Sequence, residues 1–153
     1  MRSERMVVQA ARLAFFGVLF AAAGFVAGAP AAPIVGAAAD SFPVASDVRL
    51  GGDEAQTRFV MDLNRKIDLH FFTLADPYRV IVHIPQVSFR LPPKAGESGR
   101  GLIKAFRFGL VMPGGSRIVI DLAKPARVDK AFVVDAADGA PARLVVELAA
   151  TES

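Results

Sequence analysis

The sequence predicts an all-β domain, a sandwich of two related antiparallel or mixed β-sheets, preceded by a signal-peptide helix. Three observations lead to this prediction. Apolar and polar residues alternate along most of residues 46–148, which is the period of a half-buried strand. Glycine, proline and aspartate interrupt the alternation at the short intervals typical of all-β domains. One six-residue pattern occurs in four of the strands, and no stretch after the leader sustains a helical period.

Residues 1–39 are predicted to be a signal peptide, which leaves residues 40–153 as the domain. They combine an arginine-rich start, an apolar run over residues 13–29 and a stretch rich in alanine, proline and glycine, the order of parts in an export signal. Cleavage is expected after Ala39, because Pro30 would follow the other small-residue site. An uncleaved membrane anchor is the alternative, since the seventeen-residue apolar run reaches the lower limit for a spanning helix.

Charge and composition narrow the classes of partner for residues 40–153. The whole chain has a net charge of +3, but the leader holds three arginines and one glutamate, so the domain carries a net charge of +1. A nearly neutral domain has no field that would draw a polyanion, so no nucleic-acid partner is expected. Membrane contact is expected only through an uncleaved leader. The absence of cysteine excludes disulfides, iron–sulfur clusters and cysteine-ligated metal.

Nine strands are expected along the domain. In chain order, the alternation places them at residues 47–51, 57–64, 67–74, 78–84, 87–91, 102–111, 116–122, 127–134 and 142–148. Turns are expected at residues 51–53, 76–77, 113–115 and 138–139, where glycine supplies a positive φ angle or proline fixes φ at about −65°. Residues 92–101 are expected to be the one long polar loop.

An internal repeat in four of these strands is the most informative feature. Each copy has an arginine, three apolar residues typical of strands, an acid or histidine, and an aliphatic residue; the copies are Arg58–Leu63, Arg79–Ile84, Arg117–Leu122 and Arg143–Leu148. The first and third copies start 59 residues apart, and the second and fourth 64 residues apart. This spacing indicates two related halves that bury each other's apolar faces when they pack face to face.

The two-residue period of a strand assigns a face to each repeated side chain. The inward set, expected to form the core, is Phe59, Met61, Leu63, Val80, Val82, Ile84, Ile118, Ile120, Leu122, Leu144, Val146 and Leu148. Within one strand the outward arginine and acid lie about 13 Å apart, so their partners must lie on neighbouring strands. Each outer face should therefore show arginine and acid rows beside an aliphatic ledge of Val60, Ile81, Val119 and Val145.

Two interpretations of these outer rows are open. Cross-strand charge pairs commonly only keep a sheet soluble, and each contributes roughly a few tenths of a kcal/mol. The alternative is a binding face, since arginine takes carboxylates through paired hydrogen bonds, acids accept bonds from sugar hydroxyls or amides, and β-branched residues receive methyl and acetyl groups. The pattern alone favours the first interpretation, because exposed charges usually need no function. Repetition in four strands adds support to the binding face without securing it.

Other residue constellations give little support for catalysis or metal binding. His70 and His83 lie on different strands with no motif that would supply further ligands, so neither a metal nor another cofactor is expected. Asp53 and Glu54 sit in a turn, where acids are ordinary, and no serine has a neighbouring histidine to activate it. No catalytic residue is therefore expected in this chain.

The segment of residues 90–107 has an excess of positive charge. It holds Arg90, Lys94, Arg100, Lys104 and Arg107 against a single glutamate, with three phenylalanines nearby. One interpretation is a basic, aromatic-edged groove for an anionic ligand such as a cell-wall polymer or a lipid headgroup. The other is a solvated loop whose flanking phenylalanines belong to the core.

Several of these motifs resemble the AMIN domain. They are Phe72–Val82, with its Asp-Pro-Tyr-Arg step, and Arg107-Phe108-Gly109 followed by Arg117–Leu122. The resemblance covers residues 46–150 and implies a sandwich of two related sheets that binds peptidoglycan and localises its protein, often to the division site. Matched position by position, it places the exposed ligand-binding residues at Arg58, Asp62, Arg79, Arg107, Arg117, Asp121, Arg143 and Glu147. His83 departs from the acid usual at its position.

The resemblance is closest to the module of exported N-acetylmuramoyl-L-alanine amidases, where a signal peptide, this module and a zinc hydrolase domain follow in order. The zinc domain would begin after residue 150, so this chain is expected to be no enzyme, with zinc only in that missing domain. The expected function is a periplasmic peptidoglycan-binding and localisation module of a cell-wall amidase system. The alternative is a protein-interaction adaptor that docks envelope or division proteins. A stand-alone module and a truncated amidase both remain open.

Overall fold

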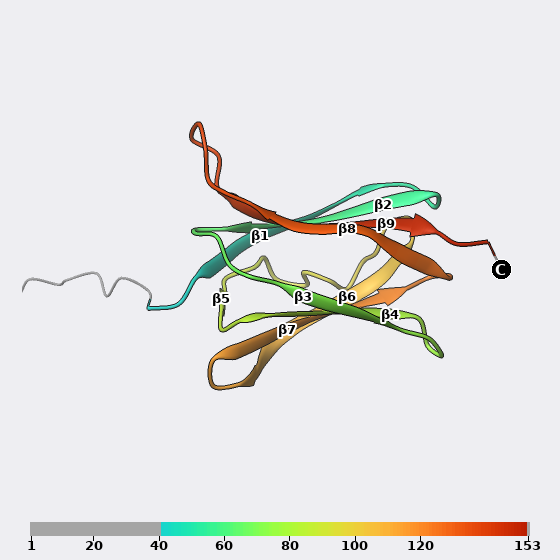
Figure 1. The fold of residues 1–153 in the computed structure, drawn as a ribbon, viewed down its shortest axis with the longest axis horizontal. Helices are drawn as coiled ribbons and strands as arrows, with labels where there is room; N and C mark the ends of the chain where they lie inside the picture. Colours follow the sequence, from blue (N-terminus) through green and yellow to red (C-terminus); the bar gives the residue numbers. More distant parts are fainter. Residues whose placement is uncertain (1–40, 153) are drawn as a thin grey trace, which may run out of the picture. The chain divides into compact units, whose positions relative to one another are not determined.

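Residues 41–152 are described by a computed structural model, and they form nine strands in two facing sheets (Figure 1). The strands are β1 (Val44–Gly52), β2 (Gln56–Leu63), β3 (His70–Leu74), β4 (Arg79–Pro85), β5 (Ser88–Phe89), β6 (Ile103–Met112), β7 (Gly115–Leu122), β8 (Ala126–Val134) and β9 (Ala142–Ala150). The predicted all-β sandwich is confirmed. Residues 41–152 contain no helix with the length and apolar character needed to cross a membrane. The expected signal peptide and its cleavage site lie outside the described residues.

The nine expected strands are all present, and the differences lie at their ends. β1 begins three residues earlier than expected, at Val44, because residues 44–45 pair in parallel with β5 and the Asn64 side chain accepts a hydrogen bond from the Val44 amide at 2.8 Å. β3 begins at His70 and not at Ile67. Ile67 lies in the connection from β2, yet its side chain is buried in the core.

The first sheet has the strand order β5-β1-β2-β9-β8, and the second sheet has the order β3-β4-β7-β6. All pairs are antiparallel except β1 with β5. The repeated strand β2 pairs with β9, and the repeated strand β4 pairs with β7. Each sheet therefore takes one copy of the repeat from each half of the chain, so the two halves interleave and neither forms a sheet by itself.

The core between the sheets contains the predicted inward set. All twelve of those side chains are at most 9% exposed, and they belong to one cluster of buried residues. Phe59 of β2 meets Phe106 of β6 edge to face, with ring centroids 5.1 Å apart, so the two sheets contact each other through aromatic rings. The alternation in the sequence therefore predicts the buried face of each repeated strand correctly.

The long connection between β5 and β6 is attached to the turn between β1 and β2 through Thr57. The buried Thr57 hydroxyl donates a hydrogen bond to the Asp53 carbonyl oxygen at 2.6 Å and accepts one from the Leu102 amide at 2.8 Å. Gly101 has φ +55° at this contact, and a Cβ there would lie 2.2 Å from the Asp53 carbonyl oxygen. Only glycine fits this close approach without a shift of the backbone.

Candidate functional site

The outer faces of the two sheets carry the same row of side chains. In the first sheet, β1, β2, β9 and β8 align one residue each to form the first central row: Arg49, Val60, Val145 and Phe132. In the second sheet, β6, β7, β4 and β3 form the second central row: Arg107, Val119, Ile81 and Phe72. Each row runs from an arginine through two aliphatic residues to an exposed phenylalanine on an edge strand, and the phenylalanines are 39% and 45% exposed.

The predicted site residues divide between these two faces. Arg58, Asp62, Arg143 and Glu147 lie on the first sheet, and Arg79, Arg107, Arg117 and Asp121 lie on the second. Because the sheets meet through their inner faces, the two groups lie on opposite sides of the sandwich. The structure therefore places the eight residues on two faces, with four on each.

On the first sheet, two acids are paired across strands. Arg58 forms an ion pair with Glu147, its register partner on β9. Asp62, whose side chain is only 13% exposed, accepts two hydrogen bonds from Arg49 on β1, at 2.8 and 2.9 Å. The hydrogen bond to Asp62 is the main cause that raises the pKa of Arg49 above its ordinary value. Arg143 lies opposite Asp62, but its buried Nε has no hydrogen-bond partner.

On the second sheet, one acid lies between two arginines. Arg79 Nε donates a hydrogen bond to Asp121 Oδ1 at 2.8 Å, and Arg107 Nε lies 3.6 Å from Asp121 Oδ2. Arg117 lies in register with His83, and its buried Nε also has no hydrogen-bond partner. Each face thus combines closed charge pairs with one arginine whose buried Nε has no hydrogen-bond partner.

The four aliphatic residues of the expected ledge lie on the outer faces, two on each sheet, but they differ in exposure. Val60 and Val119 are partly exposed, but Ile81 and Val145 are only 6% exposed. The reason is the edge strand: Phe72 lies in register beside Ile81 and Phe132 beside Val145, so an aromatic ring occupies the place where solvent was expected. The contact surface of each row is therefore aromatic at its edge and aliphatic toward the arginine.

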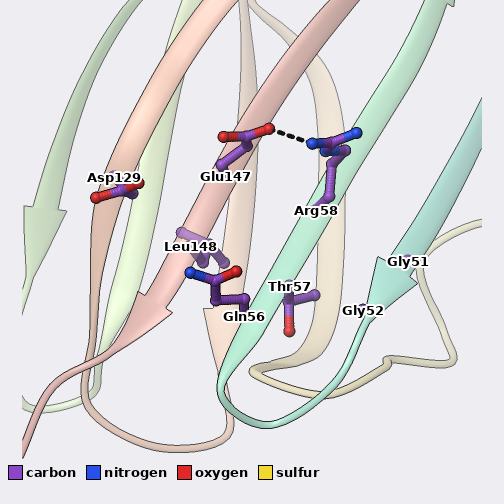
Figure 2. A pocket seen from close by; sticks show the side chains of 8 residues that line it. All are labelled: Gly51, Gly52, Gln56, Thr57, Arg58, Asp129, Glu147 and Leu148. Carbon is purple, nitrogen blue, oxygen red and sulfur yellow. Dashed lines mark hydrogen bonds and ion pairs between the residues drawn. The ribbon is translucent and has the colours of Figure 1, made fainter.

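A pocket of about 290 Å³ lies at one end of the first outer face, beside the turn between β1 and β2. Figure 2 shows the Arg58–Glu147 ion pair above it, with Gln56 of β2 and Asp129 of β8 on one side and Gly51 and Gly52 of β1 on the other. The absent side chain of Gly51 keeps this side open, since a Cβ there would meet nothing within 4 Å. Arg58 and Glu147 in this pocket already pair with each other, and its second acid, Asp129, pairs with Arg127.

The basic segment of residues 90–107 borders a pocket of about 380 Å³, which is lined by Ala95, Gly96, Glu97, Ala105, Phe106, Arg107, Phe108 and Asp121. Phe106 is buried in the core, and Phe89 and Phe108 pack against it with their ring centroids 4.9 Å apart. The Arg100 guanidinium donates to the Gly52 carbonyl oxygen at 2.9 Å, which ties the loop to β1. The phenylalanines belong to the core, as the second interpretation expects, but Phe106 and Phe108 also line a pocket beside Arg107, as the first expects. Lys104 and Arg107 are exposed.

Arg49 is the site residue that the repeat analysis missed. The segment Arg49-Leu50-Gly51 on β1 corresponds to Arg107-Phe108-Gly109 on β6, because each lies beside an equivalent repeated strand. The sequence does carry a signal for Arg49, because its arginine-apolar-glycine triplet lies 58 residues before the equivalent triplet that begins at Arg107. The six-residue repeat does not contain this triplet, because β1 and β6 lie outside the four repeated strands.

Within residues 41–152, no three histidine, aspartate or glutamate side chains cluster in a way that could hold a metal ion. His70 and His83, which the sequence analysis placed on different strands, lie in register on β3 and β4. The His83 ring stacks on Phe72, with centroids 5.5 Å apart. Both histidines therefore belong to the second outer face.

Comparison with known proteins assigns the chain to a family. The sequence model of the AMIN domain matches residues 47–148, which is most of the chain and nearly all of the described sandwich. No curated protein matches the chain. AMIN domains are non-catalytic peptidoglycan-binding and localisation modules of periplasmic or exported proteins. The chain belongs to the AMIN domain family.

Proposed function

We propose that this chain holds peptidoglycan on the outer faces of its two sheets and so localises a cell-wall amidase system in the periplasm. The observation that carries the proposal is the recurrence of one central row on both faces, from arginine through two aliphatic residues to an exposed phenylalanine. The residues proposed to contact the ligand are the eight of the sequence analysis, Arg58, Asp62, Arg79, Arg107, Arg117, Asp121, Arg143 and Glu147, together with the two central rows.

The chemistry of the rows suits a polymer of sugars and short peptides. Guanidinium groups bind carboxylates through paired hydrogen bonds, and carboxylates accept hydrogen bonds from hydroxyl and amide groups. Exposed phenylalanine and aliphatic side chains contact methyl and acetyl groups and the apolar faces of sugar rings. If the outer faces only kept the sheets soluble, the charged side chains would suffice. The exposed rings of Phe72 and Phe132 do not make the protein more soluble. Their exposure is the feature that a binding role explains.

Co-sedimentation of the full chain with isolated sacculi tests the proposal. The wild-type chain should pellet with sacculi at low salt, and retention should fall as salt screens the arginines. Replacing both exposed rings, Phe72→Ala with Phe132→Ala, should reduce retention at least about fivefold, whereas Lys66→Met on the connection between β2 and β3 should leave it unchanged. No retention of the wild-type chain at low salt would overturn the proposed function.

A second function, an adaptor for envelope or division proteins, is favoured by one observation. β3 is an edge strand whose five residues are all exposed, and the adjoining turn adds the exposed ring of Tyr78. An unpaired, apolar strand edge is the surface to which an extended segment of another protein can add a strand. Thr73→Lys places a charge on this edge outside the proposed peptidoglycan contacts, and loss of partner recruitment with intact sacculus retention would favour the adaptor.

A further inference from the structure

Arg58 and Arg117 occupy equivalent places in the two sheets but have different partners. Each begins a copy of the repeat, and the copies lie 59 residues apart. Arg58 lies in register with Glu147 and forms an ion pair with it. Arg117 lies in register with His83, and among residues 41–152 its side chain has no ion-pair partner. The second sheet therefore lacks the carboxylate that closes this pair in the first.

No other acid of the second face is placed to serve Arg117. The acid on its own strand, Asp121, is four residues away, which is about 13 Å along an extended strand. Asp121 is also held by Arg79 at 2.8 Å and by Arg107 at 3.6 Å. Only the Nε of Arg117 is shielded from solvent, so the terminal nitrogens of its guanidinium are the unpaired donors that a carboxylate from outside the chain can reach.

The neighbours of Arg117 leave room for such a carboxylate. Gly109 of β6 lies in register with Arg117, and a Cβ at Gly109 would meet nothing within 4 Å. On the other side, the His83 ring is held against Phe72 by stacking, with His70 next in register. This row of His70, His83, Arg117 and Gly109 contains no acid, so an anion there meets only neutral or positive side chains.

An apolar surface adjoins this row. The second central row lies two residues further along each strand, about 7 Å away, and presents the exposed ring of Phe72 and the partly exposed Val119. A ligand that places its carboxylate on Arg117 therefore places the atoms next to it over these side chains. Small apolar groups such as methyl groups fit this position, because they lose water against aliphatic and aromatic carbon at no polar cost.

We infer that Arg117 and His83 form a binding site for the carboxylate of a short peptide whose adjacent methyl group lies on the second central row. The inference rests on the proposed function, because short peptides with free carboxylates are a component of peptidoglycan. The external carboxylate takes the place that Glu147 fills for Arg58 in the first sheet.

Titration of the full chain with N-acetyl-D-alanyl-D-alanine, followed by NMR of the backbone amides, tests the site. The peptide acid should shift the amide signals around His83, Gly109 and Arg117. Its C-terminal amide should bind at least about tenfold more weakly, because a guanidinium–carboxylate pair is replaced by a neutral contact. Equal binding of acid and amide, or shifts confined to other strands, would overturn the inference.

Two variants sharpen this test. Arg117→Met removes the guanidinium, and His83→Glu supplies an internal carboxylate in the register position that Glu147 has opposite Arg58. Each should weaken binding of the peptide acid at least about tenfold, although His83→Glu retains Arg117. Lys66→Met makes the same change in net charge away from both outer rows and should leave the affinity unchanged. Unchanged affinity in Arg117→Met would contradict the site.

Parallel measurements on sacculi separate this inference from the proposed function. A wild-type chain that is retained by sacculi but does not bind the peptide acid would overturn the Arg117 site and leave the proposed function standing. A wild-type chain that binds the peptide acid but is not retained by sacculi would support the Arg117 site and overturn the proposed function.

Discussion

Arg49 holds Asp62 through two hydrogen bonds, from Nη1 to Oδ2 at 2.8 Å and from Nη2 to Oδ1 at 2.9 Å. Both carboxylate oxygens are thereby engaged, and Arg143, on the other side of Asp62, is left with a buried Nε that has no acceptor. On the second sheet the equivalent carboxylate, Asp121, is shared between its two arginines. Each outer face therefore has an acid between two arginines. On the first face Asp62 binds only Arg49, whereas on the second face Asp121 contacts both arginines.

This arrangement predicts that Arg143 can replace Arg49. Arg49→Ala alone should lower the free energy of unfolding by about 1 kcal/mol, and Arg143→Ala alone by close to zero. The double variant should lose at least about 1 kcal/mol more than the sum, because the mostly buried Asp62 then has neither cation. Urea unfolding of the four chains measures this coupling. Additive effects would show that Arg143 does not compensate.

Removal of the Thr57 hydroxyl should lower the stability of the domain. Thr57→Val keeps the shape of the side chain but leaves the buried Leu102 amide without its acceptor, so the free energy of unfolding should fall by about 1–3 kcal/mol. Hydrogen exchange at Leu102 should also accelerate. Thr73→Val on the exposed strand β3 is the matched control and should change stability by less than about 0.5 kcal/mol.

The lowered pKa of Asp53 should make the free energy of unfolding depend on pH. Its carboxylate accepts hydrogen bonds from the backbone amides of Gln56 and Ala55, and these lower its pKa, with Gln56 as the larger cause. A lowered pKa in the folded state means that the stabilisation is complete above about pH 4 and is lost as pH falls through the folded pKa.

Asp53→Asn isolates this contribution, because asparagine keeps an oxygen acceptor for the turn but carries no charge. Wild type should resist more denaturant than Asp53→Asn at pH 7, and the two midpoints should converge at pH 2. Denaturant midpoints measured across this pH range provide the test. A gap between the midpoints that is constant from pH 7 to pH 2 would exclude the ionised Asp53 as its cause.

The contact between the sheets predicts the largest loss of stability from a single substitution. Phe59 is fully buried and meets Phe106 edge to face, so Phe59→Ala should lower the free energy of unfolding by about 3–5 kcal/mol through a lost ring and a residual cavity. Phe42→Ala removes an exposed ring before β1 and should cost less than about 0.5 kcal/mol. Similar losses for both variants would contradict the assigned core.

The strands and the core were predictable from the sequence because they depend on local alternation. Phe59, Met61 and Leu63 follow one another at a period of two, and burial of one face is the only arrangement that satisfies such a pattern. Ile67 shows the limit of this reasoning. Its side chain is buried, as the alternation predicts, but the chain bends before β3, so the strand begins only at His70.

The pairing of strands and the choice of ion partners were not predictable in this way. The repeat gave no sign that β2 pairs with β9 and β4 with β7, because pairing depends on long-range packing and not on the pattern within a strand. Asp62 and Arg143 share a register position, yet the competing Arg49 on β1 takes the carboxylate. Burial of Ile81 and Val145 likewise depends on aromatic rings from edge strands that the repeat does not contain.

Mapping the contact surface of soluble peptidoglycan fragments by NMR tests the central claim most directly. The amide shifts of the full chain should concentrate on the outward residues of β2 and β9 and of β4 and β7, with Phe72 and Phe132 at the margins. Shifts confined to the edge of β3 and the hairpin between β6 and β7, or no shifts at saturating fragment, would contradict binding by the two outer faces.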